Sequence, residues 1–456
     1  MEDRPVPTSV GGPGFRTFWA LRRDPLAFFT DVARKTDLAD IQVGPRRFLL
    51  VSHPEDIAAI LITQHKKFIK GRGLQFTRPV LGNGLLTSEG EFWQRQRRLA
   101  QPAFHRDRLA SYARDMVRVG EALAEEWRAG GVRDVARDTT RLALAIAGKT
   151  LFNVEVGPLA DQVHADLGTL MRYTNRRIRA FVPLPTWLPT PASRRFRHAL
   201  SRLDAVIYDI IRQREATGKT AGDVLDRLMA ATDEAGGHMS HAQLRDEVMT
   251  LFLAGHETTA NGLAWTFYLI AQHPEVQERL HQEWEEVLHG RSPDPGTVER
   301  LPYTQAVIQE GLRLYPPAWM MARQAVAPFT LRGYEFPAGT QVVMSQWVMH
   351  RHPRYHPEPE RFWPDRWLDR SYPPGPGLTY FPFGAGPRLC IGRPFALLEM
   401  ALLLPILGQV AWLSPWPKPP VVPEPLITLR PKYGLSLRLE PLPARADPRT
   451  VAEALP

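Results

Sequence analysis

Cysteine is almost absent from this chain, with only Cys390 among 456 residues. A single cysteine excludes a disulfide framework and is typical of a cytosolic protein, whose thiols stay reduced. No apolar run of about 18 residues occurs, so no transmembrane anchor is predicted. The polar N-terminus (MEDRPVPTSVGGPGF) also lacks the apolar core of a signal peptide. We therefore expect a cytoplasmic protein.

Internal repeats and long polar linkers are missing as well, which favours one large domain over several. Basic residues exceed acidic ones, 57 against 48, for a formal net charge of +9. A basic chain invites a nucleic-acid interpretation. The sequence contains no matching basic motif or binding fold, so no nucleic-acid partner is expected. The plain interpretation of the charge is a solvated, arginine-rich surface.

The periodicity of apolar residues predicts a mainly α protein with a minor β portion. A short helix is expected over 25–35, a hairpin over 39–51 and a helix over 54–64. The Gly- and Pro-rich stretch 70–88 is predicted to be a long loop, and helices dominate from there to about Tyr315. Short strands follow Arg323, and a long irregular stretch covers 351–382. We expect residues 1–24 to be flexible, 25–444 to form one domain and 445–456 to be a disordered tail.

The lone cysteine lies in the segment Phe383-Gly384-Ala385-Gly386-Pro387-Arg388-Leu389-Cys390-Ile391-Gly392. The pattern F-x-x-G-x-R-x-C-x-G should arise by chance in roughly one chain of this length in ten thousand. Gly386 and Gly392 permit a tight loop, and Phe383 would shield one side of the sulfur. A helix predicted over 391–407 places the sulfur at its N-terminus, where backbone donors and the helix dipole favour a thiolate. The alternative is a coincidental loop around an inert, buried cysteine.

This segment is identified as the haem-ligand signature of the cytochrome P450 family, which the chain resembles from about Pro25 to Leu439. The resemblance implies a triangular helical domain, with haem b between a long central helix and the cysteine loop. It implies that Cys390 is the axial thiolate ligand of the haem iron. Arg388 would face a haem propionate, because a guanidinium matches a carboxylate.

A strongly apolar helix is predicted over 241–272, begun by a capping box of Ser240 and Gln243. At 1.5 Å per residue it would span roughly 50 Å. Its middle reads Ala254-Gly255-His256-Glu257-Thr258-Thr259, where Thr258 can bond back to the Ala254 carbonyl and open a groove. A simple helix bend with a polar pair is the alternative.

That segment resembles the oxygen-activation motif of the family. The resemblance implies that Thr258 hydrogen-bonds dioxygen and that Glu257 helps to relay protons. Ala254 and Gly255 would leave room above the iron, and His256 is interpreted as incidental.

Glu310 and Arg313 are spaced i, i+3 on a predicted helix, a spacing that by itself indicates an ordinary surface pair. Downstream, Phe362-Trp363-Pro364-Asp365-Arg366-Trp367 resembles a P450 motif whose arginine joins such a pair. The resemblance implies a buried, structural network of Glu310, Arg313 and Arg366.

Trp93 and Arg97, spaced i, i+4, resemble the W-x-x-x-R of the family, which binds a haem propionate. An ordinary aromatic–arginine contact is the alternative. Arg323 matches a further propionate-binding arginine of the family.

No flavin domain is attached, so electrons must come from separate proteins, with a ferredoxin and its reductase as the expected partners. The family adds a second interpretation of the net charge, namely a basic docking face for an acidic electron donor. Its residues would be Arg95, Arg97, Arg98, Arg388 and Arg393. A surface-wide excess of arginine would produce the same count.

The sequence indicates a large lipophilic substrate, because the candidate pocket residues are apolar. Family resemblance places among them Leu74, Phe76, Phe181, Phe252, Ala254, Trp319 and Met320, each of which could equally be a core residue. The segments Arg313–Trp319 and Gly82–Thr87 resemble bacterial P450s that hydroxylate carotenoid ionone rings. Fatty-acid hydroxylases share much of that pattern and are the alternative.

Two other classes of function remain, a peroxide-driven peroxygenase and a haem-thiolate sensor without enzymatic activity. Peroxygenases of the family typically replace the acid–alcohol pair by Arg-Pro, and a sensor has little use for a proton relay. The intact pair Glu257 and Thr258 therefore favours a monooxygenase.

Overall fold

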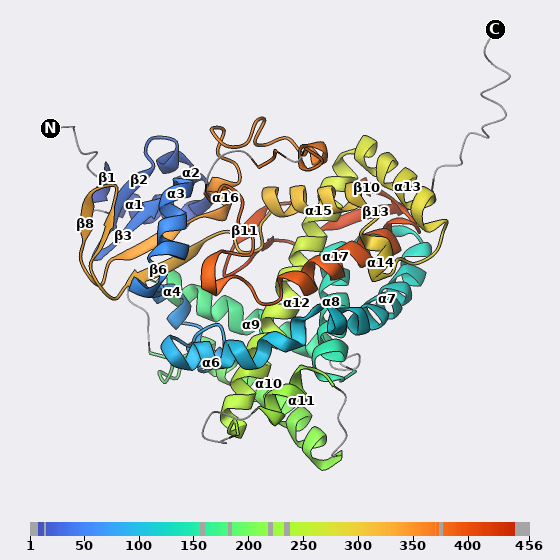
Figure 1. Cartoon of the computed structure of the whole chain (residues 1–456), viewed down its shortest axis with the longest axis horizontal. Helices are drawn as coiled ribbons and strands as arrows, with labels where there is room; N and C mark the ends of the chain where they lie inside the picture. The colour runs from blue at the N-terminus through green and yellow to red at the C-terminus, as the bar shows by residue number, and fades with distance from the viewer. Residues whose placement is uncertain are drawn as a thin grey trace, which may run out of the picture.

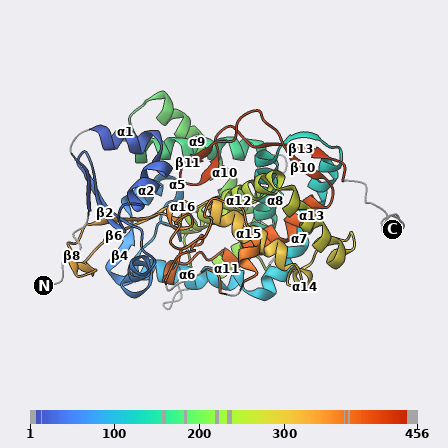
Figure 2. The same cartoon turned by 90° about the horizontal axis from the view of Figure 1, so that it is seen from above.

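The computed structural model describes residues 8–12, 15–155, 160–180, 185–217, 222–231, 238–369, 371–373 and 377–442. Helices dominate the described chain, and the outline in Figure 1 narrows towards α10 (Pro191–Thr217) and α11 (Val224–Ala230). The largest sheet occupies one side of the molecule and the helices the other, a division that Figure 2 shows from above. The mainly α class with a minor β portion is confirmed.

Further helices lie along the rest of the described chain. They are α1 (Phe15–Arg23), α2 (Pro25–Ala33), α3 (Pro54–Ala58), α4 (Arg72–Gln75), α5 (Arg78–Leu81), α6 (Gly90–Ala100), α7 (Arg106–Arg128), α8 (Val135–Phe152), α9 (Ala160–Arg179), α12 (His241–Gln272), α13 (Pro274–Leu288), α14 (Pro295–Val298), α15 (Pro302–Leu314), α16 (Gln346–Met349) and α17 (Arg393–Gly408). Short π or 3₁₀ turns are η1 (Ala59–Thr63), η2 (His65–Lys67), η3 (Gln101–Phe104), η5 (Pro364–Trp367) and η6 (Gly386–Arg388).

The six-stranded sheet has the order β1-β2-β3-β9-β6-β4. Its strands are β1 (Thr8–Gly12), β2 (Leu38–Val43), β3 (Arg46–Val51), β4 (Phe68–Lys70), β6 (Met321–Ala325) and β9 (Gln341–Met344). The expected hairpin of β2 and β3 is present, with Ala39 paired to Leu50. Because β4 pairs with β6, residues far apart in the sequence lie side by side at this edge.

The remaining strands form small sheets around the helices. A three-stranded sheet contains β10 (Trp412–Pro415), β13 (Ser436–Glu440) and β5 (Gly131–Asp134), and two-stranded hairpins join β7 (Phe329–Leu331) to β8 (Tyr334–Phe336) and β11 (Pro423–Pro425) to β12 (Leu429–Pro431).

Helix α12 runs through the centre of the helical side and covers the predicted range without change (Figure 1). It is buried nearly all round and packs against α8, α15 and α17, as expected for a helix that is apolar on every face. Its N-terminus differs in one detail from the predicted capping box. The Ser240 side chain accepts from the Gln243 backbone N–H at 3.2 Å, but the Gln243 side chain donates to Glu247 at 3.0 Å instead of returning to Ser240.

The N-terminal segment contains a strand and a helix that the sequence did not predict. Within residues 1–24, β1 pairs in parallel with β2, and α1 places Phe18 and Leu21 against the core beside the sheet. The sequence did not predict β1 and α1, because the polar, Pro- and Gly-bearing composition does not reveal these contacts. The flexibility expected for residues 1–24 stays a prediction. Residues 445–456 lie outside the described part of the chain. The predicted loop 70–88 contains the short helices α4 and α5.

Candidate functional site

The loop before Cys390 is held by its own backbone and by η1. The Cys390 N–H donates to the Phe383 carbonyl at 3.0 Å, and the Leu389 N–H donates to the Gly386 carbonyl at 2.9 Å. Gly386 has φ +68°, and a Cβ there would collide with the Leu61 carbonyl oxygen. Only glycine combines that conformation with that approach, so the loop is fixed against η1.

The sulfur of Cys390 lies at the N-terminus of α17, as predicted. Burial raises the pKa of the Cys390 thiol, while backbone N–H groups of Gly392 and Arg393 and the cations Arg97 and Lys70 lower it. The residue is nevertheless accessible to solvent. The thiol therefore combines accessibility with backbone and cationic donors around it, an environment that stabilises a thiolate.

Two small residues of α12 have solvent-accessible side chains although the helix around them is mostly buried. Ala254 is exposed although Phe252 and Leu253 beside it are buried, and the Thr258 hydroxyl one turn later is accessible as well. The Thr258 hydroxyl donates to the Ala254 carbonyl at 2.7 Å, which is the predicted back-bond. Helix α12 packs against α17, the helix that follows the cysteine loop.

Four cations gather beside the cysteine loop, namely Lys70, Arg97, Arg323 and Arg388. The Arg97 guanidinium donates to the Leu389 carbonyl at 2.6 Å, and the Arg388 guanidinium pairs with Glu89 and lies 3.8 Å from the centre of the Trp93 ring. Lys70 and Arg323 are directly opposed in the β4–β6 pair. The structure thus brings together Trp93, Arg97, Arg323 and Arg388, as the sequence analysis expected.

Burial lowers the pKa of every one of these cations. It lowers the pKa of Arg323 to about 10 and that of Arg388 to about 10, and, with Arg323 and Arg388 nearby, that of Lys70 to about 7. Glu89 is the one carboxylate that opposes these shifts in all three. Four basic side chains thus face a single carboxylate, and a pKa of about 7 leaves Lys70 only partly protonated near neutral pH. The desolvated cluster remains positive and favours anions.

Lys70 and Glu89 were not identified from the sequence. Glu89 accepts the Lys70 backbone N–H at 2.7 Å and also pairs with Arg388, so it joins β4 to the cysteine loop. These contacts join residues far apart in the chain, and no local sequence pattern reports them.

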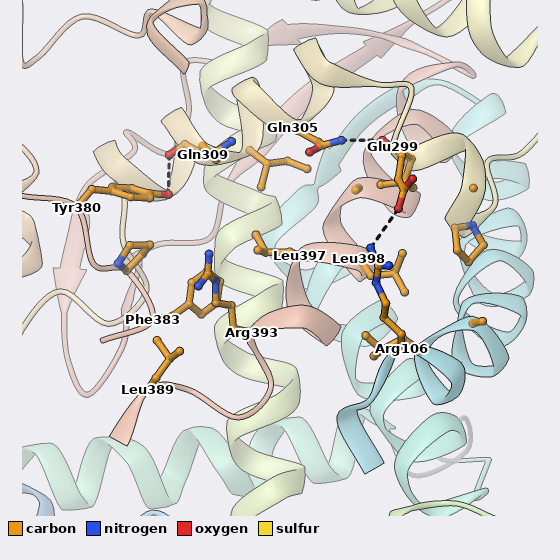
Figure 3. A pocket seen from close by; sticks show the side chains of 18 of the residues that line it. Arg106, Glu299, Gln305, Gln309, Tyr380, Phe383, Leu389, Arg393, Leu397 and Leu398 are labelled. Atoms are coloured by element: carbon orange, nitrogen blue, oxygen red, sulfur yellow. Dashed lines mark hydrogen bonds and ion pairs between the residues drawn. The ribbon is translucent and has the colours of Figure 1, made fainter. Parts of the chain in front are cut away.

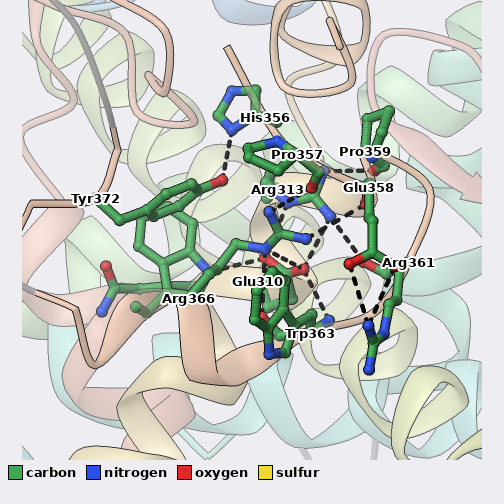
Figure 4. A network of polar contacts seen from close by, with 12 residues as sticks. Glu310, Arg313, His356, Pro357, Glu358, Pro359, Arg361, Trp363, Arg366 and Tyr372 are labelled. Carbon is green, nitrogen blue, oxygen red and sulfur yellow. Dashed lines mark hydrogen bonds and ion pairs between the residues drawn. The ribbon is translucent and has the colours of Figure 1, made fainter. Parts of the chain in front are cut away.

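Glu310, Arg313 and Arg366 form a buried network, shown in Figure 4. The Arg313 guanidinium donates to both oxygens of Glu310, each at 2.8 Å, and Arg366 Nε donates to Glu310 Oε1 at 3.1 Å. The Trp367 indole and the Trp363 backbone N–H also donate to this carboxylate. Arg313 further donates to three backbone carbonyls of the irregular stretch, at residues 350, 359 and 361. The network therefore fixes the chain that leads into the cysteine loop.

Comparison with known proteins agrees with this geometry. The family model described as "Cytochrome P450" matches residues 11–432. The chain belongs to the cytochrome P450 family. It is 37% identical over 432 residues to "Cyclooctatin synthase" of Streptomyces melanosporofaciens, covering 94% of this chain and 92% of that protein. It is 37% identical to "Cyclooctat-9-en-7-ol 5-monooxygenase" of the same organism, covering 94% and 92%.

The chain is also 34% identical to "Pentalenene oxygenase" of Streptomyces avermitilis, covering 92% of this chain and 94% of that protein. With the family and these relatives, the protein is a P450 monooxygenase, an oxidoreductase that carries haem b with an axial cysteine thiolate.

The residues of this P450 fit that cofactor. Haem b brings two propionates, and the basic cluster of Lys70, Arg97, Arg323 and Arg388 would hold such carboxylates. Cys390, the single cysteine, would hold the iron, and the accessible Ala254 and Thr258 leave space on the α12 side.

The candidate substrate residues do not all lie on a cavity. Leu74 lines a small cavity of about 50 Å³ together with Lys70, and Phe76 and Met320 are half-buried. Phe252 is buried against Phe152 and His256, and buried Trp319 donates its indole N–H to the Leu426 carbonyl at 2.8 Å. Both residues pack in the hydrophobic core, the alternative that the sequence left open. Phe181 lies outside the described residues.

A larger pocket, of about 780 Å³, opens on the cysteine-loop side of this P450 (Figure 3). Phe383, Leu389 and Arg393 line it, and Arg106 and Glu299 pair across it at 3.4 Å. Of the arginines expected on a docking face, Arg98 and Arg393 are exposed and Arg95 is half-buried, whereas Arg97 and Arg388 turn inward to the loop and Glu89.

None of the helices in the described ranges is both long enough and apolar enough to span a bilayer. The same residues contain no cluster of three or more His, Cys, Asp or Glu side chains suited to a metal ion. A single protein ligand on the iron, as in a haem-thiolate site, needs no such cluster.

Proposed function

We propose that this P450 monooxygenase hydroxylates a C–H bond of a large, lipophilic isoprenoid. The observation that carries the proposal is the small, accessible surface of Ala254 and Thr258 among apolar residues of α12, the helix that packs against α17 behind the single cysteine. The names of three relatives support the class, since they refer to cyclooctatin, cyclooctat-9-en-7-ol and pentalenene.

Within that proposal, Cys390 is the axial ligand and Glu257 and Thr258 deliver protons. The bound haem supplies oxygen activation, in which the thiolate donates electron density. The Thr258 hydroxyl donates its proton to the Ala254 carbonyl at 2.7 Å, so its oxygen is left to accept a hydrogen bond until that back-bond opens. Desolvation raises the pKa of the Glu257 carboxyl, which suits this half-buried side chain to carry a proton.

A carotenoid ionone ring is the finer candidate, because carotenoids are themselves isoprenoids with cyclic ends. The chain is 31% identical to "Protein LUTEIN DEFICIENT 5, chloroplastic" of Arabidopsis thaliana, covering 80% of this chain and 65% of that protein, and lutein is a carotenoid. Fatty-acid hydroxylation is the second candidate. We further propose that a ferredoxin and its reductase supply the two electrons that a P450 monooxygenase consumes in each turnover.

The test is product analysis in a bacterial host that co-expresses the chain with a ferredoxin and its reductase. Separate cultures accumulate β-carotene or pentalenene, or are fed palmitate, and mass spectrometry counts the added oxygens. Oxygenated isoprenoid with unchanged palmitate is expected. Oxygenated palmitate alone would overturn the isoprenoid proposal and favour the fatty-acid candidate.

Two variants accompany the products. Thr258→Ala should consume electrons without matching product and release peroxide, and unchanged coupling would contradict the assigned role. Cys390→Ser should lose the thiolate-shifted Soret band of the reduced carbonyl complex, which checks the axial ligand independently of any substrate.

A further inference from the structure

The acid of the oxygen-side motif is held by a residue from the C-terminal hairpin. Thr428, in the turn between β11 and β12, donates its hydroxyl to Glu257 Oε1 at 2.7 Å. The Asn261 amide, one turn further along α12, lies 3.5 Å from the same hydroxyl. Thr428 and Asn261 are both more than nine-tenths buried, so bulk water does not replace these contacts.

The turn that carries Thr428 is itself fastened on both sides. The Trp265 indole, on the same stripe of α12, donates to the Leu429 carbonyl at 3.0 Å, and the Leu429 N–H donates to the Pro317 carbonyl at 2.9 Å. The Trp319 indole donates to the Leu426 carbonyl at 2.8 Å. Two buried tryptophans thus fix the backbone around Thr428, and a side chain on so constrained a turn holds its partner in one place.

From this geometry we infer that Thr428 is a positioning residue for proton delivery by Glu257, with Asn261 as its second anchor. The inference rests on the proposed role of Glu257. The Thr428 hydroxyl engages Oε1, and within the described residues Oε2 receives no hydrogen bond, so Oε2 is the oxygen available to carry the proton. Glu257 gives that proton towards Thr258 and takes another from water, so one proton enters for each that leaves.

The same hairpin also places a partly exposed charge near the Glu257 carboxyl. Arg430 follows two residues after Thr428, pairs with Glu424 at 3.2 Å and is partly exposed. Burial raises the pKa of Glu257, and the Thr428 hydrogen bond and the Arg430 charge both lower it. Thr428 and Arg430 from the hairpin are thus the groups that act on the Glu257 carboxyl, and Asn261 adds an uncharged donor to the hydroxyl. The hairpin therefore sets how readily Glu257 exchanges a proton with solvent.

The test uses Thr428→Val, which keeps the shape and removes the hydroxyl, and Thr428→Ser, which restores it. Thr330→Val, at an exposed position of the β7–β8 hairpin, is the matched control. Infrared difference spectra of the haem-loaded protein, assigned by subtraction of Glu257→Gln, follow the pH titration of the Glu257 carboxyl. Loss of one charge-assisted hydrogen bond should raise the midpoint by about one unit, tenfold in the acidity constant. Thr428→Ser and Thr330→Val should titrate like the wild type.

A second readout counts peroxide released per electron consumed, with β-carotene and pentalenene as probes. Thr428→Val should shift this ratio several-fold towards that of Glu257→Gln, and Thr428→Ser should restore it. The role of Thr428 would be overturned, with the relay left standing, by either of two results. One is an unshifted Glu257 titration in Thr428→Val, and the other is unchanged coupling in Thr428→Val while Glu257→Gln uncouples. Unchanged coupling in Glu257→Gln itself would instead overturn the proposed relay. The Soret band of the reduced carbonyl complex shows that each variant is folded and ligated.

Discussion

Glu310 and Asp209 each precede an arginine by three residues on a helix, but the two pairs have opposite surroundings. Glu310 and Arg313 have no exposed side-chain surface, whereas the side chains of Asp209 and Arg212 are more than half exposed. Removing one partner of a buried pair leaves the other charge buried and unpaired, which is costly. At an exposed pair, water solvates the remaining charge and the cost is small. The same local sequence therefore has two different energetic consequences.

We expect Glu310→Gln to lower the free energy of unfolding by about 3–5 kcal/mol, because Arg313 and Arg366 lose their shared carboxylate. Asp209→Asn, the matched i, i+3 control on α10, should change it by less than about 1 kcal/mol. Denaturant unfolding of the haem-loaded proteins measures both. Equal effects of the two substitutions would contradict the structural role of the buried network.

Glu399 on α17 is a fully buried carboxyl whose two oxygens have no hydrogen-bond partner among the described residues. Burial raises its pKa well above the usual value, so the folded protein keeps the proton that the unfolded chain releases above about pH 4.5. Wild-type stability is consequently lost as the pH rises, by about 1.4 kcal/mol per unit until the folded-state pKa is reached.

Glu399→Gln keeps the shape of the side chain but cannot release a proton, so it removes the contribution of Glu399 to the pH dependence of stability. Its stability relative to the wild type should therefore rise with pH between about 5 and 8. Urea unfolding at several pH values measures the difference. A difference that stays constant over this range would show that Glu399 is already ionised in the folded protein.

At the scale of elements, the cysteine loop depends on how closely it approaches η1. Gly386 combines φ +68° with a site where a Cβ would collide with the Leu61 carbonyl oxygen, whereas Gly333 has φ +80° and nothing within 4 Å of the added atom. The two glycines separate the cost of the backbone conformation from the cost of the collision.

We expect Gly333→Ala to cost about 1–2 kcal/mol from the left-handed backbone alone. Gly386→Ala should cost about 1–3 kcal/mol more, from displacement of the loop or of η1. Thermal unfolding gives the first difference, and the haem content of the purified protein reports the displaced loop. Similar stability and haem content in both variants would mean that η1 does not constrain the loop.

Elements with strong local patterns were predicted well. Helix α12 begins after Ser240 and ends before Pro274 because the cap and the proline are local signals. The β2–β3 hairpin follows from alternation around Gly44-Pro45. Helix α1 and strand β1 were missed, since their order depends on pairing with β2 and on burial of Phe18 and Leu21, which the local composition does not report.

The candidate site shows the same division. Cys390, Thr258, Glu310 and Arg366 stand in dense motifs, and the structure brings each to the expected surroundings. Lys70, Glu89 and Thr428 were missed because their contacts join segments distant in the sequence. Trp319 and Phe252 were assigned to the pocket by resemblance of their segments to the family, with a core role left equally open, and both are buried. Their apolar character does not distinguish a cavity wall from a core.

At the scale of the whole molecule, the net charge of +9 should increase the rate of association with an acidic electron donor. Arg393 and Arg106 line the pocket on the cysteine-loop side, and exposed Arg98 follows Arg97, which contacts the cysteine loop. An acidic ferredoxin would be attracted to this side, and salt would weaken the attraction.

We expect reduction of the protein by an acidic ferredoxin to slow as ionic strength rises from about 0.05 to about 0.5 M, where the Debye length becomes shorter than about 5 Å. Arg98→Glu should slow reduction at low salt and match the wild type at high salt, as measured by stopped-flow absorbance. Arg23→Glu on α1, outside that pocket, is the control. Equal slowing by both variants would favour a surface-wide charge excess without a docking face.

The opposition of Lys70 and Arg323 in the β4–β6 pair has a consequence for how the protein matures in the cell. Like charges directly opposed across two strands are unfavourable. The carboxylates of a bound haem would offset that repulsion, so the sheet edge and the prosthetic group would stabilise each other. We expect newly made chains to complete this edge only after haem capture and to remain open to proteases until then. The haem supply of the host would then govern how much enzyme accumulates, quite apart from how much is translated.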